Sequence, residues 1–105
     1  MSTIRLTPAL LAEITASLEP NKGDRDALGR LHTLLANQRR ERDGSVRIAP
    51  APELEDALMG TLDYLLDKWT CSLPYVYGIG NQRRLERFME QASDLLRART
   101  HRIDA

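Results

Sequence analysis

The longest amphipathic pattern in the chain lies in its middle, between Glu53 and Trp69. Apolar side chains recur there three or four positions apart, at Leu54, Leu58, Leu62, Leu65 and Trp69. This spacing predicts a helix. Its uncharged arc is widened to roughly 200°, at 100° per residue, by Ala57, Met59, Thr61 and Leu66. A surface helix needs only about half that arc, so we expect this helix to be central, with neighbours on two sides.

Two shorter patterns predict helices before it. Thr7 supplies a capping hydroxyl and Pro8 suits the first helical position, so a helix is predicted over Pro8–Leu18. Its inward face comprises Leu10, Leu11, Ile14 and Leu18. A second helix is predicted from Asp24, a good N-cap, to the arginines Arg39, Arg40 and Arg42. Its inward face comprises Ala27, Leu28, Leu31, Leu34 and Leu35.

The pattern after Trp69 predicts a break at residues 70–74 and then a structured loop over Pro74–Gly80. Asn81 is expected to cap a last helix over Gln82–Arg102. The inner face of that helix comprises Leu85, Phe88, Met89, Ala92, Leu95 and Leu96. Its apolar arc is near 120°, as expected for a helix that packs on one side only.

Two short segments alternate polar and apolar residues, as strands do: Thr3–Thr7 and Ser45–Ala49. The likeness extends to TIRLTPA at 3–9 and SVRIAPA at 45–51. Three interpretations stay open: the segments pair as a ribbon, a strand–helix unit was duplicated, or the likeness is coincidental. The expected fold is mainly α, a small four-helix bundle-like single domain over residues 1–105 with at most a minor two-stranded β ribbon.

The amino-acid composition argues against some classes of function. The chain has 105 residues, with 15 basic and 15 acidic side chains and a formal net charge of +0. This balance argues against unselective binding to nucleic acids or membrane surfaces. Residues 50–80 carry one base and five acids, whereas the segments on either side are each basic by two charges. No secretory signal and no membrane-spanning run is apparent, so the expected location is the cytoplasm.

Catalytic and metal-binding sets are not evident. His32 and His101 have no histidine, cysteine or carboxylate at ligand spacing, so we expect no metal and no cofactor. Cys71 has no histidine tied to it and is expected to be a buried structural thiol. The Gly78-Ile79-Gly80 segment lacks the third glycine of a dinucleotide-binding fingerprint. The sequence therefore favours a protein that is not an enzyme.

Charged residues form two notable groups. Asp56, Asp63 and Asp67 share a face of the central helix with Glu53 alongside, and a solvated acidic stripe is commoner than a cation site. Asn-Gln-Arg-Arg occurs at 37–40 and again at 81–84. The second copy is expected at a helix N-terminus, where each cation opposes the helix dipole by about 0.3–1 kcal/mol. These cations are Arg83, Arg84 and Arg87. A nearby negative partner is therefore expected: the acidic stripe of the same chain or a second copy, or an external anion.

The loop before the last helix is the best candidate for a contact surface. Tyr75 and Tyr77 supply large, rigid, amphipathic area beside glycines, which is typical of interface centres. Alternation sends both tyrosines to the same side and leaves Val76 and Ile79 to plug the helix bundle. The leading hypothesis is a small adaptor or inhibitor that binds another protein through Tyr75 and Tyr77, steered by the charged faces. Self-association through this surface is an open alternative, and no membrane partner is expected.

Residues 3–42 resemble a ribbon–helix–helix DNA-binding unit: strand TIRLT, helix PALLAEITASL, turn EPNKG and helix DRDALGRLHTLLANQRRER. In that family a dimer forms a two-stranded ribbon whose alternate side chains enter the major groove. The resemblance implies that Thr3, Arg5 and Thr7 read bases and that Ile4 and Leu6 are buried. Asp24 and Asp26 depart from the family pattern, because they would repel a phosphate at the start of the second helix. The second hypothesis is accordingly a DNA-binding transcription regulator or antitoxin, with nucleic acid as its partner.

Overall fold

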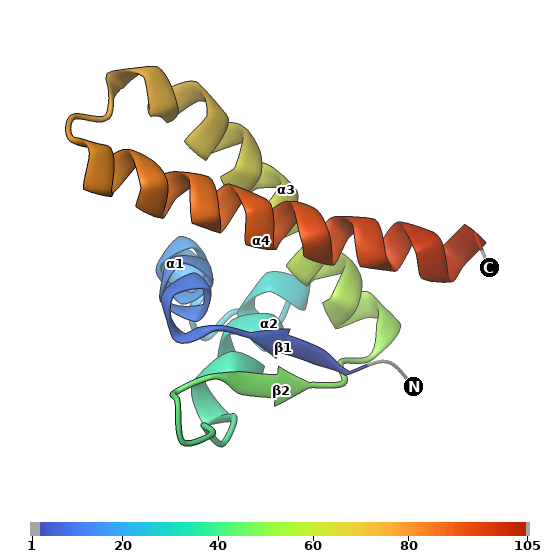
Figure 1. Cartoon of the computed structure of the whole chain (residues 1–105). Helices are drawn as coiled ribbons and strands as arrows, with labels where there is room; N and C mark the ends of the chain where they lie inside the picture. The colour runs from blue at the N-terminus through green and yellow to red at the C-terminus, as the bar shows by residue number, and fades with distance from the viewer. Residues whose placement is uncertain (1–2, 105) are drawn as a thin grey trace. The chain divides into compact units, whose positions relative to one another are not determined.

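The computed structural model describes the backbone of residues 3–104 and the side chains of residues 3–100 (Figure 1). The elements along the chain are β1 (Ile4–Leu6), α1 (Pro8–Leu18), α2 (Ala27–Asn37), β2 (Val46–Ile48), α3 (Pro52–Ser72) and α4 (Ile79–Asp104). Two 3-10 helices, η1 (Glu19–Asn21) and η2 (Leu73–Tyr75), follow α1 and α3. The prediction of a mainly α fold with a minor ribbon is confirmed. The chain divides into two compact units, Met1–Thr61 and Leu62–Ala105.

The two strand-like segments pair with each other in the first unit. β1 and β2 run antiparallel, with Ile4 opposite Ile48, Arg5 opposite Arg47 and Leu6 opposite Val46 (Figure 1). The four apolar side chains are buried and the two arginines are exposed. This is the alternation expected of a ribbon with one face on the core and one in solvent. Of the three interpretations left open by the sequence, pairing is therefore what the structure shows.

Helix α1 has the predicted bounds. The Thr7 hydroxyl accepts a hydrogen bond from the backbone N–H of Leu10 at 3.5 Å, and Pro8 occupies the first helical position. A capping hydroxyl followed by proline favours one residue as the start of the helix. The predicted inward face is buried along its whole length, at Leu10, Leu11, Ile14 and Leu18.

Helix α2 begins later than predicted. Its N-cap is Asp26, whose carboxylate accepts the backbone N–H of Gly29 at 2.9 Å, and not Asp24. The chain at Asp24 passes so close to the first turn that a Cβ on Gly29 would meet its carbonyl group. Both aspartates are good caps by composition. The chain at Asp24 lies beside the first turn of α2, in the space that a Cβ on Gly29 would fill, and Asp26 stands at the cap position.

Helix α2 also ends earlier than predicted, at Asn37, so Arg39, Arg40 and Arg42 lie in the loop that follows. Gln38 is extended, and its side-chain amide donates to the backbone carbonyl of Arg47 at 3.1 Å. The prediction of basic residues in the last turn is therefore wrong. The residue that follows the helix instead contacts β2, and the local pattern does not reveal this contact.

His32 is one of the few buried polar residues of the first unit, with 8% of its surface exposed. Its Nε2 atom lies 3.1 Å from Oε2 of Glu19, which connects α2 to η1. The two residues are 13 positions apart, so spacing rules for a single helix could not reveal the pair.

Helix α3 is longer than predicted, because Thr70, Cys71 and Ser72 continue it. The hydroxyls of Thr70 and Ser72 donate to the carbonyls four residues earlier, at 2.7 and 2.8 Å. Threonine and serine hydroxyls can bond to backbone carbonyls inside a helix as well as in turns, so these residue types do not by themselves mark a helix end. The wide apolar arc is confirmed, since the buried residues of α3 include Leu58, Met59, Thr61, Leu62, Leu65 and Trp69.

In the second unit, the C-terminal part of α3 and helix α4 form an antiparallel hairpin (Figure 1). Phe88 and Ala92 are buried on α4, and the other residues of its predicted inner face are half-buried. The ring of Phe88 contacts that of Trp69 on α3. Among the described residues, none of the helices combines the length and apolar character needed to cross a membrane.

Candidate functional site

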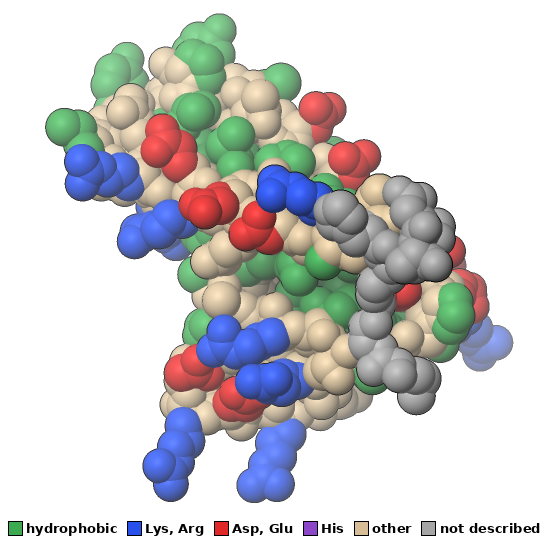
Figure 2. All heavy atoms as spheres, turned by 45° about the vertical axis from the view of Figure 1, so that its right-hand side comes forward, with side chains coloured by type: hydrophobic (Ala, Val, Ile, Leu, Met, Phe, Trp, Pro, Cys, Tyr) green, Lys and Arg blue, Asp and Glu red, His purple; other side chains and the backbone are tan. Residues whose placement is uncertain are grey.

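Large apolar side chains are exposed where the α3–α4 hairpin turns. We call residues 73–84 the tip; it comprises η2, the connecting loop and the start of α4. Tyr75 is 80% exposed, Tyr77 91% and Ile79 68%. Hydrophobic side chains come to the surface at this end of the hairpin (Figure 2). Tyr64, earlier on α3, is a further exposed aromatic residue, at 61%.

The tip backbone is held by its own hydrogen bonds. The Asn81 side-chain amide donates to the Tyr77 carbonyl, and that of Gln82 donates to the Val76 carbonyl, both at 3.0 Å. The Gln82 backbone N–H donates to the Gly78 carbonyl at 3.0 Å. Gly78 has a φ of +90°, a left-handed conformation that glycine adopts without strain. The tyrosines are therefore exposed on an ordered turn.

Two predictions about this region are wrong. Ile79, expected to plug the helix bundle, is exposed as the first residue of α4. Asn81 was expected to cap this helix, but it lies inside the first turn, and Gly78 directly precedes the helix. The positive φ of Gly78 reverses the chain early enough for α4 to begin at Ile79. Val76, the other expected plug, is half-buried.

The three arginines of the second Asn-Gln-Arg-Arg motif lie further into α4 than expected. Arg83 and Arg84 are at the fifth and sixth helical positions, and Arg87 is at the ninth. Helix-dipole effects fall off within the first turn, so these side chains do not oppose the dipole appreciably. The predicted conflict with the dipole is therefore wrong, and it cannot be the reason for a nearby negative group.

The same arginines are exposed and have no ionic partner among the described side chains of their unit. Within residues 62–100, Arg83, Arg84 and Arg87 form no ion pair, and the expected pairing with Asp63 or Asp67 of that unit is not observed. The guanidinium carbon of Arg84 lies 5.5 Å from the centre of the Phe88 ring, a cation–π arrangement. Exposed cations therefore follow the exposed tyrosines along the chain.

The acidic side chains that the sequence places on one face of α3 are exposed. Asp56, Asp63 and Asp67 are all exposed, and Glu53 beside them forms two hydrogen bonds with Arg30, at 3.0 and 3.3 Å. Across the described residues, no group of three or more histidine, cysteine, aspartate or glutamate side chains could hold a metal ion. The side chain of His101 lies outside the described residues.

Cys71 is exposed, not buried as expected. Because α3 continues through Ser72, Cys71 stays in helical register with Trp69, two residues earlier. Two residues correspond to 200° around a helix. The thiol therefore points away from the side on which Trp69 is buried.

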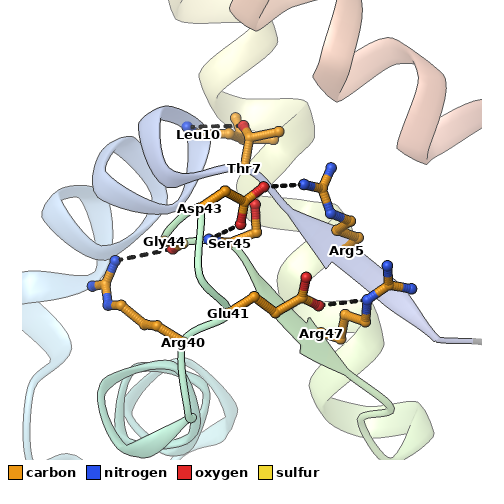
Figure 3. Close-up of polar contacts among 9 residues, drawn as sticks. All are labelled: Arg5, Thr7, Leu10, Arg40, Glu41, Asp43, Gly44, Ser45 and Arg47. Carbon is orange, nitrogen blue, oxygen red and sulfur yellow. Dashed lines mark hydrogen bonds and ion pairs between the residues drawn. The ribbon is translucent and has the colours of Figure 1, made fainter.

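A second cluster of charged residues covers the exposed face of the ribbon (Figure 3). Arg5 and Arg47 stand opposite each other, and each meets a carboxylate from the loop before β2: Arg5 meets Asp43, and Arg47 meets Glu41. Like charges facing each other across a ribbon repel, so the two carboxylates stabilise this arrangement. Thr3 is exposed, whereas the Thr7 hydroxyl caps α1.

The Asp43 carboxylate also organises the loop that carries it. One of its oxygens accepts the backbone N–H of Ser45 at 2.9 Å. This hydrogen bond, with a further contribution from the Arg5 guanidinium, lowers the pKa of Asp43 below its ordinary value of 3.8. The Arg5–Asp43 pair joins residues 38 positions apart. The sequence carries no local signal for it.

Comparisons with protein-family models, with curated proteins and with solved structures give no match to this chain.

Proposed function

We propose that this chain is a small non-enzymatic regulatory protein, an adaptor or inhibitor, that binds another protein through the tip. The observation that carries the proposal is the exposure of Tyr75 and Tyr77, at 80% and 91%, on a hydrogen-bonded turn. Tyrosine is enriched at interfaces because it offers a large apolar ring together with a hydroxyl that forms hydrogen bonds.

The order of the tip strengthens this proposal. A turn that is already held in place loses little conformational entropy on binding, so more of the contact energy remains as affinity. The side-chain amides of Asn81 and Gln82 donate hydrogen bonds to the carbonyls of Tyr77 and Val76, and these bonds hold the loop backbone in place. The arginines that follow on α4 would steer the approach of a charged partner.

A double substitution tests the proposal. We expect Tyr75→Ala/Tyr77→Ala to leave the melting temperature within about 2 °C of the unsubstituted protein, because exposed side chains contribute little to stability. The same variant should lose the partner that the unsubstituted protein captures from its native cell. Tyr64→Ala is the matched control. It removes an exposed tyrosine that lies about 12 Å along α3 from Ser72, away from the tip, and this variant should retain the partner.

Two outcomes would contradict the proposal. If the double variant unfolds, the tyrosines stabilise the fold and are not a free contact surface. If it captures the same partner as the Tyr64→Ala control, binding takes place elsewhere on the chain.

DNA binding by the ribbon is a second candidate function, favoured by the order of elements. A strand followed by two helices occurs twice, as β1-α1-α2 and β2-α3-α4, and the two strands pair with each other. In the ribbon–helix–helix family, which residues 3–42 resemble, the ribbon joins two chains. The repeated order in one chain is consistent with an internal version of that arrangement, acting as a transcription regulator or antitoxin.

Salt-dependent binding separates this candidate from the first. A DNA-binding ribbon should shift duplex DNA at low salt and lose affinity steeply as salt rises. Arg5→Ala should weaken binding, whereas Arg25→Ala, which removes an exposed cation before α2, should not. No shift of any duplex at micromolar protein and low salt would rule this candidate out.

A further inference from the structure

We infer that the tip recognises an acidic protein segment, one in which aspartate or glutamate side chains alternate with apolar ones. This inference rests on the proposed function, because it names the chemistry of the partner that the same tip would bind. It is carried by the local charge, by arginines that form no ion pair with the described residues of their unit, and by the kind of apolar side chains exposed.

The charge of the tip differs from that of the whole chain. The tip, residues 73–84, contains two basic residues, Arg83 and Arg84, and no acidic residue. Both cations are exposed. Although the chain has a net charge of +0, the tip therefore carries a local charge of +2. Complementary potential favours an acidic partner here and disfavours a basic one.

Two of the arginines form a pair of anchor points. Arg83 and Arg87 are four residues apart on α4, so they lie on one face with about 5–6 Å between their Cβ atoms. Neither is ion-paired within residues 62–100, although Glu86 and Glu90 lie on the same helix. Arg83 lies in the tip and Arg87 one turn beyond it, and two guanidinium groups without an ion pair among the described residues of this unit suit two carboxylates presented at similar spacing. Guanidinium binds carboxylate with paired hydrogen bonds.

Arg84 contributes in a different way. Its guanidinium lies over the Phe88 ring, and a planar cation stacked on an aromatic face keeps its N–H groups at its edges, available to acceptors. Because Phe88 is itself buried, the cation lies on a fixed support.

The apolar side chains favour a protein segment over a lipid surface. Two of the three strongly exposed apolar side chains of the tip are tyrosines, and only Ile79 is aliphatic. Helices that lie in a membrane surface bury a continuous apolar face, whereas the tip exposes its large apolar side chains around a turn. Tyrosine with neighbouring arginine is also typical of protein interfaces. The tyrosine hydroxyls would form hydrogen bonds with a peptide backbone.

Selection from a random dodecapeptide display library tests this inference without knowledge of the natural partner. The full chain is immobilised, and bound peptides are sequenced and then measured in solution. We expect peptides enriched in Asp and Glu together with Leu, Ile or Phe, and an affinity that falls about tenfold between 50 and 300 mM salt. Arg83→Gln/Arg87→Gln should weaken binding about tenfold or more, and Tyr75→Ala/Tyr77→Ala should abolish it.

The matched control for charge is Arg39→Gln/Arg42→Gln. It removes two exposed cations from the loop after α2, changes the net charge equally and should leave the affinity unchanged. Thermal unfolding of each variant confirms that it is folded. Glutamine maintains helix propensity close to that of arginine, so the α4 variant tests charge and not helix stability.

Each alternative result has its own meaning. Selected peptides that need Tyr75 and Tyr77 but are not acidic, and that tolerate Arg83→Gln/Arg87→Gln, would overturn the inference and leave the proposed function standing. Peptides that bind the tyrosine variant equally well would count against both. Binding to vesicles of phosphatidylcholine with 30% phosphatidylserine, without selection of acidic peptides, would overturn the inference in favour of a membrane surface.

Discussion

Trp69 on α3 and Phe88 on α4 lie ring against ring, with centroids 5.4 Å apart and planes inclined by 31°. Both side chains are 95% buried. Tilted aromatic pairs at this distance attract each other beyond the burial of their surfaces. Since η2 and the loop provide the only covalent link between the two helices, this pair stabilises the hairpin that presents the tip.

Truncation of Trp69 should therefore destabilise the second unit. We expect Trp69→Ala to lower the free energy of unfolding by about 3–5 kcal/mol, the usual cost of removing a large buried aromatic side chain. Trp69→Phe retains a ring beside Phe88 and should cost less. Urea unfolding followed by circular dichroism measures both. Equal losses for the two variants would show that the ring contact contributes nothing specific.

The position of the α2 cap leads to a second prediction. Asp26→Ala removes the acceptor for the Gly29 N–H and should lower the free energy of unfolding by about 1 kcal/mol. Asp24→Ala is the control, because composition alone marks it as an equally good cap. Its side chain forms no hydrogen bond with the described residues, so it should change stability by less than about 0.5 kcal/mol. The reverse order of effects would place the start of α2 at Asp24 after all.

Two helical glycines should respond oppositely to the same substitution. Gly29→Ala would place a Cβ against the Asp24 carbonyl and should cost about 1–3 kcal/mol, as overpacking does. A Cβ on Gly60, inside α3, would meet no atom within 4 Å. Gly60→Ala should therefore raise stability by about 0.5–1 kcal/mol through helix propensity. Thermal and urea unfolding measure both, and a neutral Gly29→Ala would show that the chain at Asp24 can move away.

Local rules predict those parts of the fold in which a single signal acts. Thr7 and Pro8 have no competitor, and α1 has the predicted bounds. Asp24 competes with Asp26, and the choice depends on how close the chain passes to Gly29. Thr70 and Ser72 favour a turn by composition, but their hydroxyls bond to carbonyls of the preceding turn and α3 continues. Errors arise where two local signals are balanced and the outcome depends on contacts that the pattern of residue types does not encode.

The candidate site shows the same division. The sequence identifies Tyr75, Tyr77 and the nearby arginines as a surface, because aromatic residues beside glycines and clustered cations are compositional signals. It misses Ile79, because an aliphatic residue after a loop is normally expected in a core. It also misses the partners of Arg5 and Arg47. These partners depend on the pairing of β1 with β2 and on a loop distant in sequence from β1, and no periodic pattern encodes them.

The ribbon cluster supplies the last prediction, which concerns pH. The Ser45 N–H and the Arg5 guanidinium lower the pKa of Asp43 in the folded chain below its ordinary value of 3.8. A carboxylate whose pKa is lowered by folding stabilises the folded state when it is ionised. Its contribution is fully present about one unit or more above pH 3.8, and it is lost as the pH falls through the lowered folded-state pKa.

The stability difference between the unsubstituted protein and Asp43→Asn should therefore be largest near pH 6 and shrink towards pH 3. Asp24→Asn, which removes the same charge at another exposed aspartate of the first unit, is the control for the loss of one negative charge. Urea unfolding at pH 3, 4, 5 and 6 measures all three proteins. A difference between the unsubstituted protein and Asp43→Asn that stays constant over this range would mean that folding does not alter the titration of Asp43.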